Sequence, residues 1–222
     1  MKKLLLSIVF SVLYVLPTSA DMGINVGVSG SAGVFTASAD ETFTPASTEN
    51  RNQNGSEHGE AGWGSIFGEI SMNRAFIGID YVPSSLETET AETAKSDKQT
   101  TGSDAVTEGD NIIQIDFEDL TTYYVGAMVT DNLYVKAGIT TVDVITNESL
   151  ATGGSYGNVS LDGSMFGVGY HLANSNGAFL RVEGNYMSFD GATQTNSDDN
   201  EKSIRLKNLD GVSGKISVGK SF

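Results

Sequence analysis

The chain has 222 residues, a formal net charge of −15 at pH 7 and no cysteine. The absence of cysteine excludes disulfide bonds, thiolate zinc sites and the acylated N-terminal cysteine of a lipoprotein. The negative charge argues against nucleic acid as a partner, because binding to phosphates depends on Lys and Arg. Twenty-six glycines against three prolines favour closely packed strands over a proline-rich stalk.

Residues 1–20 have the layout of a secretory signal peptide. Lys2 and Lys3 precede the apolar run 4–16, and small side chains follow at the expected cleavage site. The run is too short for a membrane helix, and no later segment approaches the ~20 consecutive apolar residues that a spanning helix needs. We therefore expect export, a single domain from residue 21 to 222 and a mature charge of about −17. Any membrane span must consist of strands.

Eight segments of the mature chain alternate apolar and polar side chains, as half-buried strands do. Their connections differ in length in a regular way. Three are short turns, at 73–74, 131–132 and 173–177, and the others are long and polar, at 37–59, 84–111, 146–160 and 190–208. Short turns at one end and long loops at the other are typical of an outer-membrane barrel with a periplasmic N-terminus. The membrane-crossing parts are expected at 22–36, 60–72, 75–83, 112–130, 133–145, 161–172, 178–189 and 209–222.

The two faces of these segments differ in a consistent way. In the last segment Val212, Ile216 and Val218 share one face, and Ser213 and Lys215 share the other. A soluble sandwich buries such an apolar face, whereas a small membrane barrel turns it toward lipid and encloses the polar face. Glycine and serine are frequent on the polar face, which suits a narrow lumen. The pattern predicts an all-β fold, an eight-stranded antiparallel up-and-down transmembrane β-barrel.

Two stretches carry a resemblance to a known family. They are the hairpin SIFGEISMNRAFIGIDYVP at 65–83 and the terminus GKISVGKSF at 214–222. With the overall layout, they make residues 21–222 resemble the eight-stranded outer-membrane barrels that include the OmpA transmembrane domain and OmpX-like proteins. The resemblance implies a monomer among outer-membrane lipids. It also implies that the barrel-assembly machinery reads a terminal signal formed by Ile216, Val218 and Phe222.

Six charged residues fall on the face that such a barrel would enclose. Three acids balance three bases, and in a lumen of low dielectric they must pair or keep water. The favoured interpretation is a static plug, because an eight-stranded interior is just wide enough for side chains to fill. The alternative is a gate of ion pairs that opens a narrow pore for small polar solutes or ions. The residues are Glu69, Asp80, Lys136, Arg181, Glu183 and Lys215.

Other polar residues support weaker hypotheses. A lipid-modifying enzyme could use His58 together with Ser96-Asp97 or Ser103-Asp104 as its catalytic site. Their spacing does not support this site, and a solvated histidine in a loop is the ordinary outcome. The acids of the second and fourth long loops could attract divalent cations, yet lack the spacing of a calcium loop. The aromatic residues suit two interfacial girdles, an upper one of Trp63, Tyr81, Tyr123 and Tyr186 and a lower one of Tyr170 and Phe222. The alternative is the ordinary preference of aromatic residues for strands.

Together these patterns predict a non-enzymatic outer-membrane protein without a cofactor or metal. Its expected role is envelope integrity and surface interaction through long acidic extracellular loops, with an unknown extracellular ligand. A narrow passive pore is the alternative, and an outer-membrane lipid-modifying enzyme is a distant third.

Overall fold

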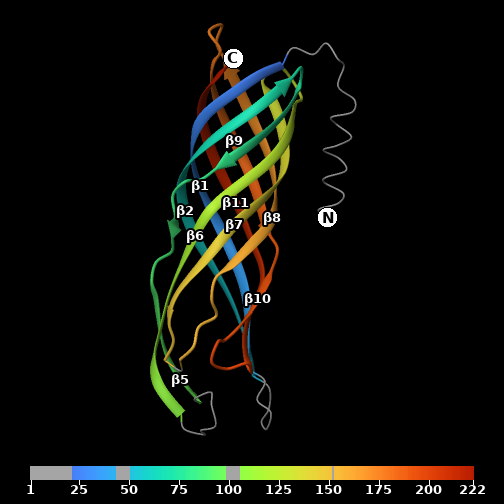
Figure 1. Cartoon of the computed structure of the whole chain (residues 1–222). Helices are drawn as coiled ribbons and strands as arrows, with labels where there is room; N and C mark the ends of the chain where they lie inside the picture. Colours follow the sequence, from blue (N-terminus) through green and yellow to red (C-terminus); the bar gives the residue numbers. More distant parts are fainter. Residues whose placement is uncertain (1–21, 44–50, 99–105, 152) are drawn as a thin grey trace.

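A computed structural model of the chain describes residues 22–43, 51–98, 106–151 and 153–222 (Figure 1). These residues form eleven β-strands, and no helix among them is long and apolar enough to cross a membrane. The expected signal peptide lies outside the described residues. The strands are β1 (Met22–Phe43), β2 (Arg51–Met72), β3 (Ala75–Tyr81), β4 (Leu86–Glu87), β5 (Ala91–Lys98), β6 (Val106–Met128), β7 (Leu133–Ser149), β8 (Val159–Ala173), β9 (Ala178–Phe189), β10 (Ala192–Thr195) and β11 (Lys202–Ser221).

Eight of these strands form a closed ring. Antiparallel pairing runs in the order β1-β2-β3-β6-β7-β8-β9-β11, and β11 pairs with β1 from Asn25–Ser221 to Phe43–Lys202. The short strands β4 and β5 lie along β6, and β10 lies along β11. Because the ring has no free edge where it is complete, its backbone polar groups are satisfied without water. The expected eight-stranded up-and-down barrel is confirmed.

Side chains alternate between the outside and the lumen as the sequence pattern predicts. Large apolar side chains cover the outside, with Val182 52% and Ile216 58% exposed. Their neighbours on the same strands point inward and are polar: Arg181 is 5% exposed and Ser217 is 1% exposed. An apolar outside around a polar inside is the reverse of a soluble protein, and it is stable only where lipid surrounds the barrel.

The three short turns lie at the end of the barrel where the chain terminates (Figure 1). Asn73 closes the β2–β3 hairpin with a φ of 53°, a left-handed conformation that asparagine tolerates. In the turn before β9, the side chain of Asn174 accepts hydrogen bonds from the amides of Asn176 and Ala178, both at 3.0 Å. Local side-chain bonds of this kind fix tight turns without further packing.

At the opposite end, the strands extend well beyond the segments predicted to cross the membrane. The expectation that 37–59 is a loop is wrong for its described residues, because β1 continues to Phe43 and β2 begins at Arg51. The β1–β2 ladder continues without a break through pairs such as Thr36–His58 and Ser38–Ser56. Both faces of such a hairpin meet water, so polar residues can sustain the ladder where no apolar alternation marks it. Strands β5, β6, β7, β10 and β11 likewise occupy parts of the other predicted loops.

The connections at this end also bind one another. The amide of Ser197 donates to the carbonyl of Ser155 at 2.8 Å, and the side chain of Asn196 donates to the carbonyl of Gly153 at 3.3 Å. Burial raises the pKa of the Tyr156 hydroxyl, and the nearby carboxylates of Glu41 and Glu148 raise it further. These contacts hold the β7–β8 connection against the β10–β11 connection.

The inverted faces can be tested by placing one charge in lipid. Replacing Val182 by Arg on the outer face of β9 should destabilise the barrel by ~2–4 kcal/mol near the membrane midplane. The measurement is a urea titration in lipid vesicles, read by the heat-modifiable migration of the folded barrel. Thr195→Arg, on exposed β10, is the matched control and should change stability by less than ~0.5 kcal/mol. Equal losses in both variants would mean that Val182 does not face lipid.

Candidate functional site

The six charged residues singled out from the sequence meet in the lumen. They come from β2, β3, β7, β9 and β11, and each is at most 8% exposed. The ring closure brings them together, since Glu69 and Arg181 are 112 positions apart in the chain. The structure sorts them into three acid–base pairs: Glu69–Arg181, Glu183–Lys136 and Asp80–Lys215. Buried charges must be paired in this way, because an uncompensated one costs several kcal/mol.

The pair formed by Glu69 and Arg181 has the most complete set of hydrogen bonds. Two guanidinium nitrogens of Arg181 donate to the two carboxylate oxygens of Glu69, at 2.6 and 2.8 Å. The same carboxylate accepts from the Tyr124 hydroxyl at 2.8 Å and from the Asn25 side chain at 3.1 Å. Two parallel charge-assisted bonds fix both groups in one plane, so this pair joins β2 and β9 across the lumen.

Aromatic rings surround the Arg181 guanidinium. Its central carbon lies 4.7 Å from the ring centre of Phe179, 5.4 Å from that of Tyr134 and 5.7 Å from those of Phe67 and Phe76. The Nε of Arg181 also donates to Nδ1 of His171 at 3.0 Å. A desolvated guanidinium is favoured by the faces of such rings, and the rings exclude water from its ion pair. We call Phe67, Phe76, Tyr134 and Phe179 the aromatic cage.

The two other pairs lie next to this assembly. Lys136 Nζ contacts Glu183 Oε2 at 2.5 Å, and the Tyr134 hydroxyl donates to the other oxygen of Glu183 at 2.5 Å. Lys215 donates to the carboxylate of Asp80. Tyr134 therefore contributes to both assemblies, as a ring beside Arg181 and as a donor to Glu183. The Glu69–Arg181 and Glu183–Lys136 pairs thus form one connected network, and the Asp80–Lys215 pair lies beside it.

Glycines make room for the large side chains of this network. A Cβ at Gly126 would lie 2.2 Å from the ring of Phe76, and one at Gly169 would lie 2.3 Å from the ring of Tyr134. Both contacts are far shorter than atoms tolerate, so even alanine would displace a ring at these positions. This close approach explains why glycine is frequent on the inner face.

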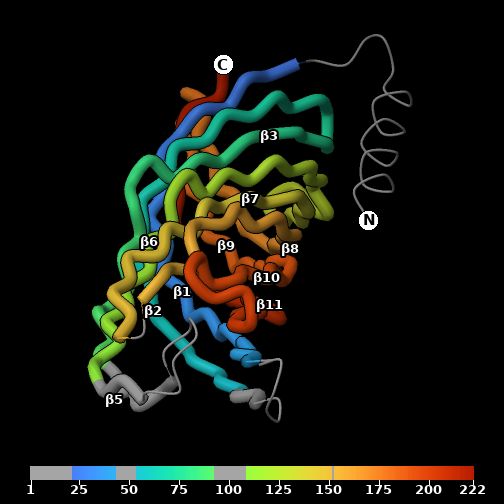
Figure 2. Tube along the Cα trace, turned by 60° about the horizontal axis from the view of Figure 1, so that its bottom comes forward, coloured from blue at the N-terminus to red at the C-terminus, as the bar shows by residue number. Residues whose placement is uncertain are grey.

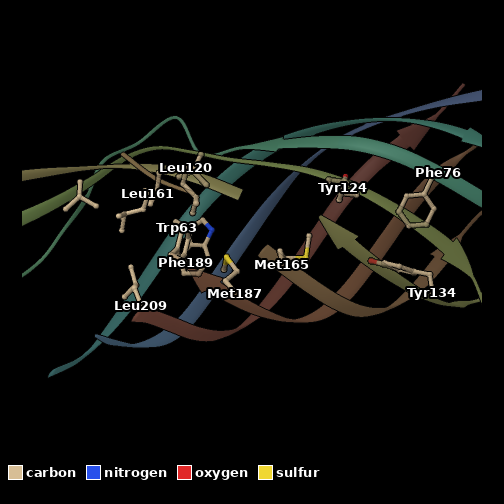
Figure 3. Close-up of a cluster of buried hydrophobic side chains, with 13 residues drawn as sticks. Trp63, Phe76, Leu120, Tyr124, Tyr134, Leu161, Met165, Met187, Phe189 and Leu209 are labelled. Carbon is tan, nitrogen blue, oxygen red and sulfur yellow. The ribbon is translucent and has the colours of Figure 1, made fainter. Parts of the chain in front are cut away.

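Buried apolar side chains fill the lumen beyond the charges, toward the end opposite the short turns. Trp63, Met165, Met187, Phe189 and Leu209 pack together there (Figure 3). A cavity of about 30 Å³ remains between them and the ion pairs, with Lys136 and Lys215 in its wall. Its volume admits no more than a few water molecules. The described lumen is therefore filled by a charged layer and an apolar layer in series.

The structure corrects one assignment and adds residues that sequence reasoning missed. The sequence pattern predicts Trp63 in the upper interfacial girdle, but the side chain is 8% exposed and belongs to the lumen core. The prediction is wrong because Trp63 lies an even number of positions before Glu69 on β2, so the two side chains point to the same inner face. The same alternation could have identified three members of the aromatic cage. Phe67, Tyr134 and Phe179 each lie two positions before a lumen charge and therefore point to the same inner face.

The other residues singled out from the sequence are not part of this network where the structure describes them. His58 is exposed on β2, Ser96 and Asp97 lie in β5, and Ser103-Asp104 lies outside the described residues. Within the described part of the chain, no cluster of His, Asp and Glu is arranged to hold a metal ion. Ile216, Val218 and Phe222 all face outward, at 58%, 51% and 74% exposure. Their recognition as an assembly signal stays a prediction.

Comparison with known proteins gives structural matches only. No known family profile matches the chain, and no curated protein sequence matches it. The outer-membrane protein OprG of Pseudomonas aeruginosa superposes with a TM-score of 0.54 at 12% identity, covering 91% of this chain and 97% of OprG. Weaker matches include Ail of Yersinia pestis (TM-score 0.36, 8% identity, 87% and 99% covered) and the protease OmpT of Escherichia coli (0.39, 9%, 90% and 97%).

OprG shares the fold with this chain at an identity too low to imply a shared activity. The closed ring of eight strands and its apolar outer band independently require a lipid environment. The chain is thus an outer-membrane protein with the fold of the small, eight-stranded outer-membrane β-barrels.

Proposed function

We propose that the chain is a non-enzymatic membrane protein built on a statically closed barrel. Its extracellular strands and acidic loops interact with ligands outside the cell and contribute to envelope integrity. The observation that carries this proposal is the bidentate Glu69–Arg181 pair within the aromatic cage. A gate needs alternative partners of similar energy, and here the guanidinium, carboxylate and rings satisfy one another in a single arrangement. The role assigned to the lumen residues is therefore structural.

A narrow pore is the second candidate, and the small cavity beside Lys136 and Lys215 favours it. A conducting path would have to separate ion pairs in the charged layer and also displace side chains of the apolar layer. Separating the ion pairs leaves buried charges without a partner, which is costly. We therefore rank the pore below the closed barrel, and we retain the absence of enzymatic activity as part of the proposal.

The closed arrangement predicts strong coupling between Glu69 and Arg181. Arg181→Ala alone leaves a buried carboxylate and should destabilise the barrel by ~3–5 kcal/mol. Adding Glu69→Ala should recover part of this loss, and a double-mutant cycle in urea titrations isolates the coupling. Lys215→Ala with Glu69→Ala is the matched control, because Lys215 pairs with Asp80 instead. The Lys215 and Glu69 substitutions should show much weaker coupling than the Arg181 and Glu69 substitutions.

Planar-bilayer conductance of the same variants separates plug from pore. The closed barrel predicts negligible conductance in the wild type, and no open channel in Arg181→Ala while the apolar layer remains. Weak coupling in the cycle together with a large rise in conductance would replace the proposed function with the pore.

Surface display can be tested on intact cells. Trypsin should cut within 84–111, which contains Lys95 and Lys98, because this segment belongs to the end opposite the short turns. Arg74 lies in an exposed turn at the other end and should be cut only after permeabilisation. Mass spectrometry of the released peptides identifies the site. Cleavage at Arg74 in sealed cells would mean that the orientation is reversed.

A further inference from the structure

Strand β2 extends far beyond its partner β3. It pairs with β1 along its whole length, from Arg51 to Met72, but with β3 only from Ile66 onward. After Tyr81 the chain follows β6 instead, through the bond from the Val82 amide to the Leu120 carbonyl and through β4 and β5. The far ends of the β1–β2 and β5–β6 hairpins lie apart in Figure 1, and the coloured parts of β2 and β6 diverge from each other toward the same end of the barrel in Figure 2. Among the described strands, none pairs with β2 on this side between residues 51 and 65.

The direction of the backbone groups identifies which amides face the free side. Ile24 exchanges both of its backbone hydrogen bonds with Phe222, so even-numbered residues of β1 face β11 and odd-numbered ones face β2. The β1–β2 register joins odd to odd, as in Asn25–Glu69, and has no shift. Even-numbered residues of β2 therefore point their N–H and C=O groups away from β1. Along the free edge these are Asn54, Ser56, His58 and Glu60.

This edge lacks the usual protection against pairing. Natural edge strands are blocked by lysine, by proline or by a bulge. Residues 54–65 contain no lysine, arginine or proline, and they pair with β1 without a bulge. A long, regular and unblocked row of donors and acceptors is a template for an added strand.

The charges beside the edge select the partner. Glu57 and Glu60 lie on β2, and the segment that follows β3 carries Glu87, Glu89 and Glu92, all exposed. Neither 54–65 nor 82–92 contains a lysine or arginine. A second copy of the chain would set like charges opposite one another, which disfavours edge pairing between copies.

We propose that the free edge of β2, residues 54–60, binds an extended basic peptide segment as an added antiparallel or parallel strand. This inference rests on the proposed function, in that it names the partner class of the extracellular surface. Backbone hydrogen bonds to the even-numbered residues supply the affinity, and the glutamates select lysine or arginine side chains.

The experiment measures fluorescence anisotropy of a labelled Lys-Thr-Lys-Thr-Lys-Thr-Lys peptide with the full barrel in uncharged detergent. We expect saturable binding that weakens as salt is raised. The same peptide methylated on alternate backbone nitrogens keeps its charge but loses donors, and it should bind about tenfold more weakly. A Glu-Thr peptide of equal length should not bind.

Two variants of one residue separate strand addition from charge attraction. His58→Pro removes an amide that faces the free side while sparing the bonds to β1, and it should weaken binding about tenfold. The matched control His58→Ala keeps that amide and should bind within about twofold of wild type. Glu57→Gln with Glu60→Gln should reduce both affinity and salt dependence. Heat-modifiable migration confirms that each variant is folded, and the methylated peptide tests the same bonds without any variant.

Equal binding of the methylated and unmethylated peptides would overturn strand addition, and equal binding of the acidic peptide would overturn charge selection. Absence of saturable binding would overturn the whole inference, as would self-association of the barrel that His58→Pro abolishes. Because peptide binding and conductance are measured separately on the same protein, a barrel that stays closed but binds no peptide contradicts this inference and leaves the closed-barrel proposal standing.

Discussion

Hydrocarbon offers no hydrogen bonds, so every backbone amide of a strand in the membrane must find its partner in another strand. The ring of eight strands meets this constraint by pairing β11 with β1. Once the ring is closed, each strand has one face in lipid and one in a narrow lumen. Apolar side chains such as Val182 then belong outside, and polar ones such as Arg181 belong inside.

Enclosing charges creates a second constraint, which the lumen meets by complete pairing. The carboxylate of Glu69 accepts four hydrogen bonds, and the aromatic cage keeps water from its partner Arg181. Tyr134 extends the network to Glu183 and Lys136. Since removal of one member leaves another unsatisfied, the network favours one closed state and holds strands β2, β7 and β9 in register.

The alternation of side chains was sufficient to predict the fold and the inner or outer face of most residues. It identified the six lumen charges because each of them lies between outward-facing neighbours on its strand. It did not predict which acid meets which base, since contacts such as Glu69–Arg181 depend on how the ring closes. Trp63 differs from its predicted place because its position in the alternation, not its aromatic character, turns its side chain into the lumen.

Beyond the membrane the same reasoning fails for a physical reason. Both faces of the extended β1–β2 hairpin meet water, so pairs such as Ser38–Ser56 lie in a ladder that no apolar alternation reveals. The free edge of β2 was equally invisible, because it depends on β3 ending at Tyr81 while β2 continues. Edges are set by the relative lengths of neighbouring strands, and a single strand's sequence does not contain that information.

A barrel that presents its apolar face to lipid and seals its polar face can be tested by the access of small reagents to each face. Because the chain has no cysteine, single cysteines at successive positions of β9 can carry spin labels without background. Power-saturation measurements in bilayers then compare access of oxygen, which concentrates in lipid, with access of a water-soluble nickel complex. Labels at 180, 182 and 186 should be accessible to oxygen, and those at 187 and 189, which point into the lumen without belonging to an ion pair, should be shielded from both reagents. High nickel access at 187 and 189 would mean an open aqueous lumen and would contradict the account.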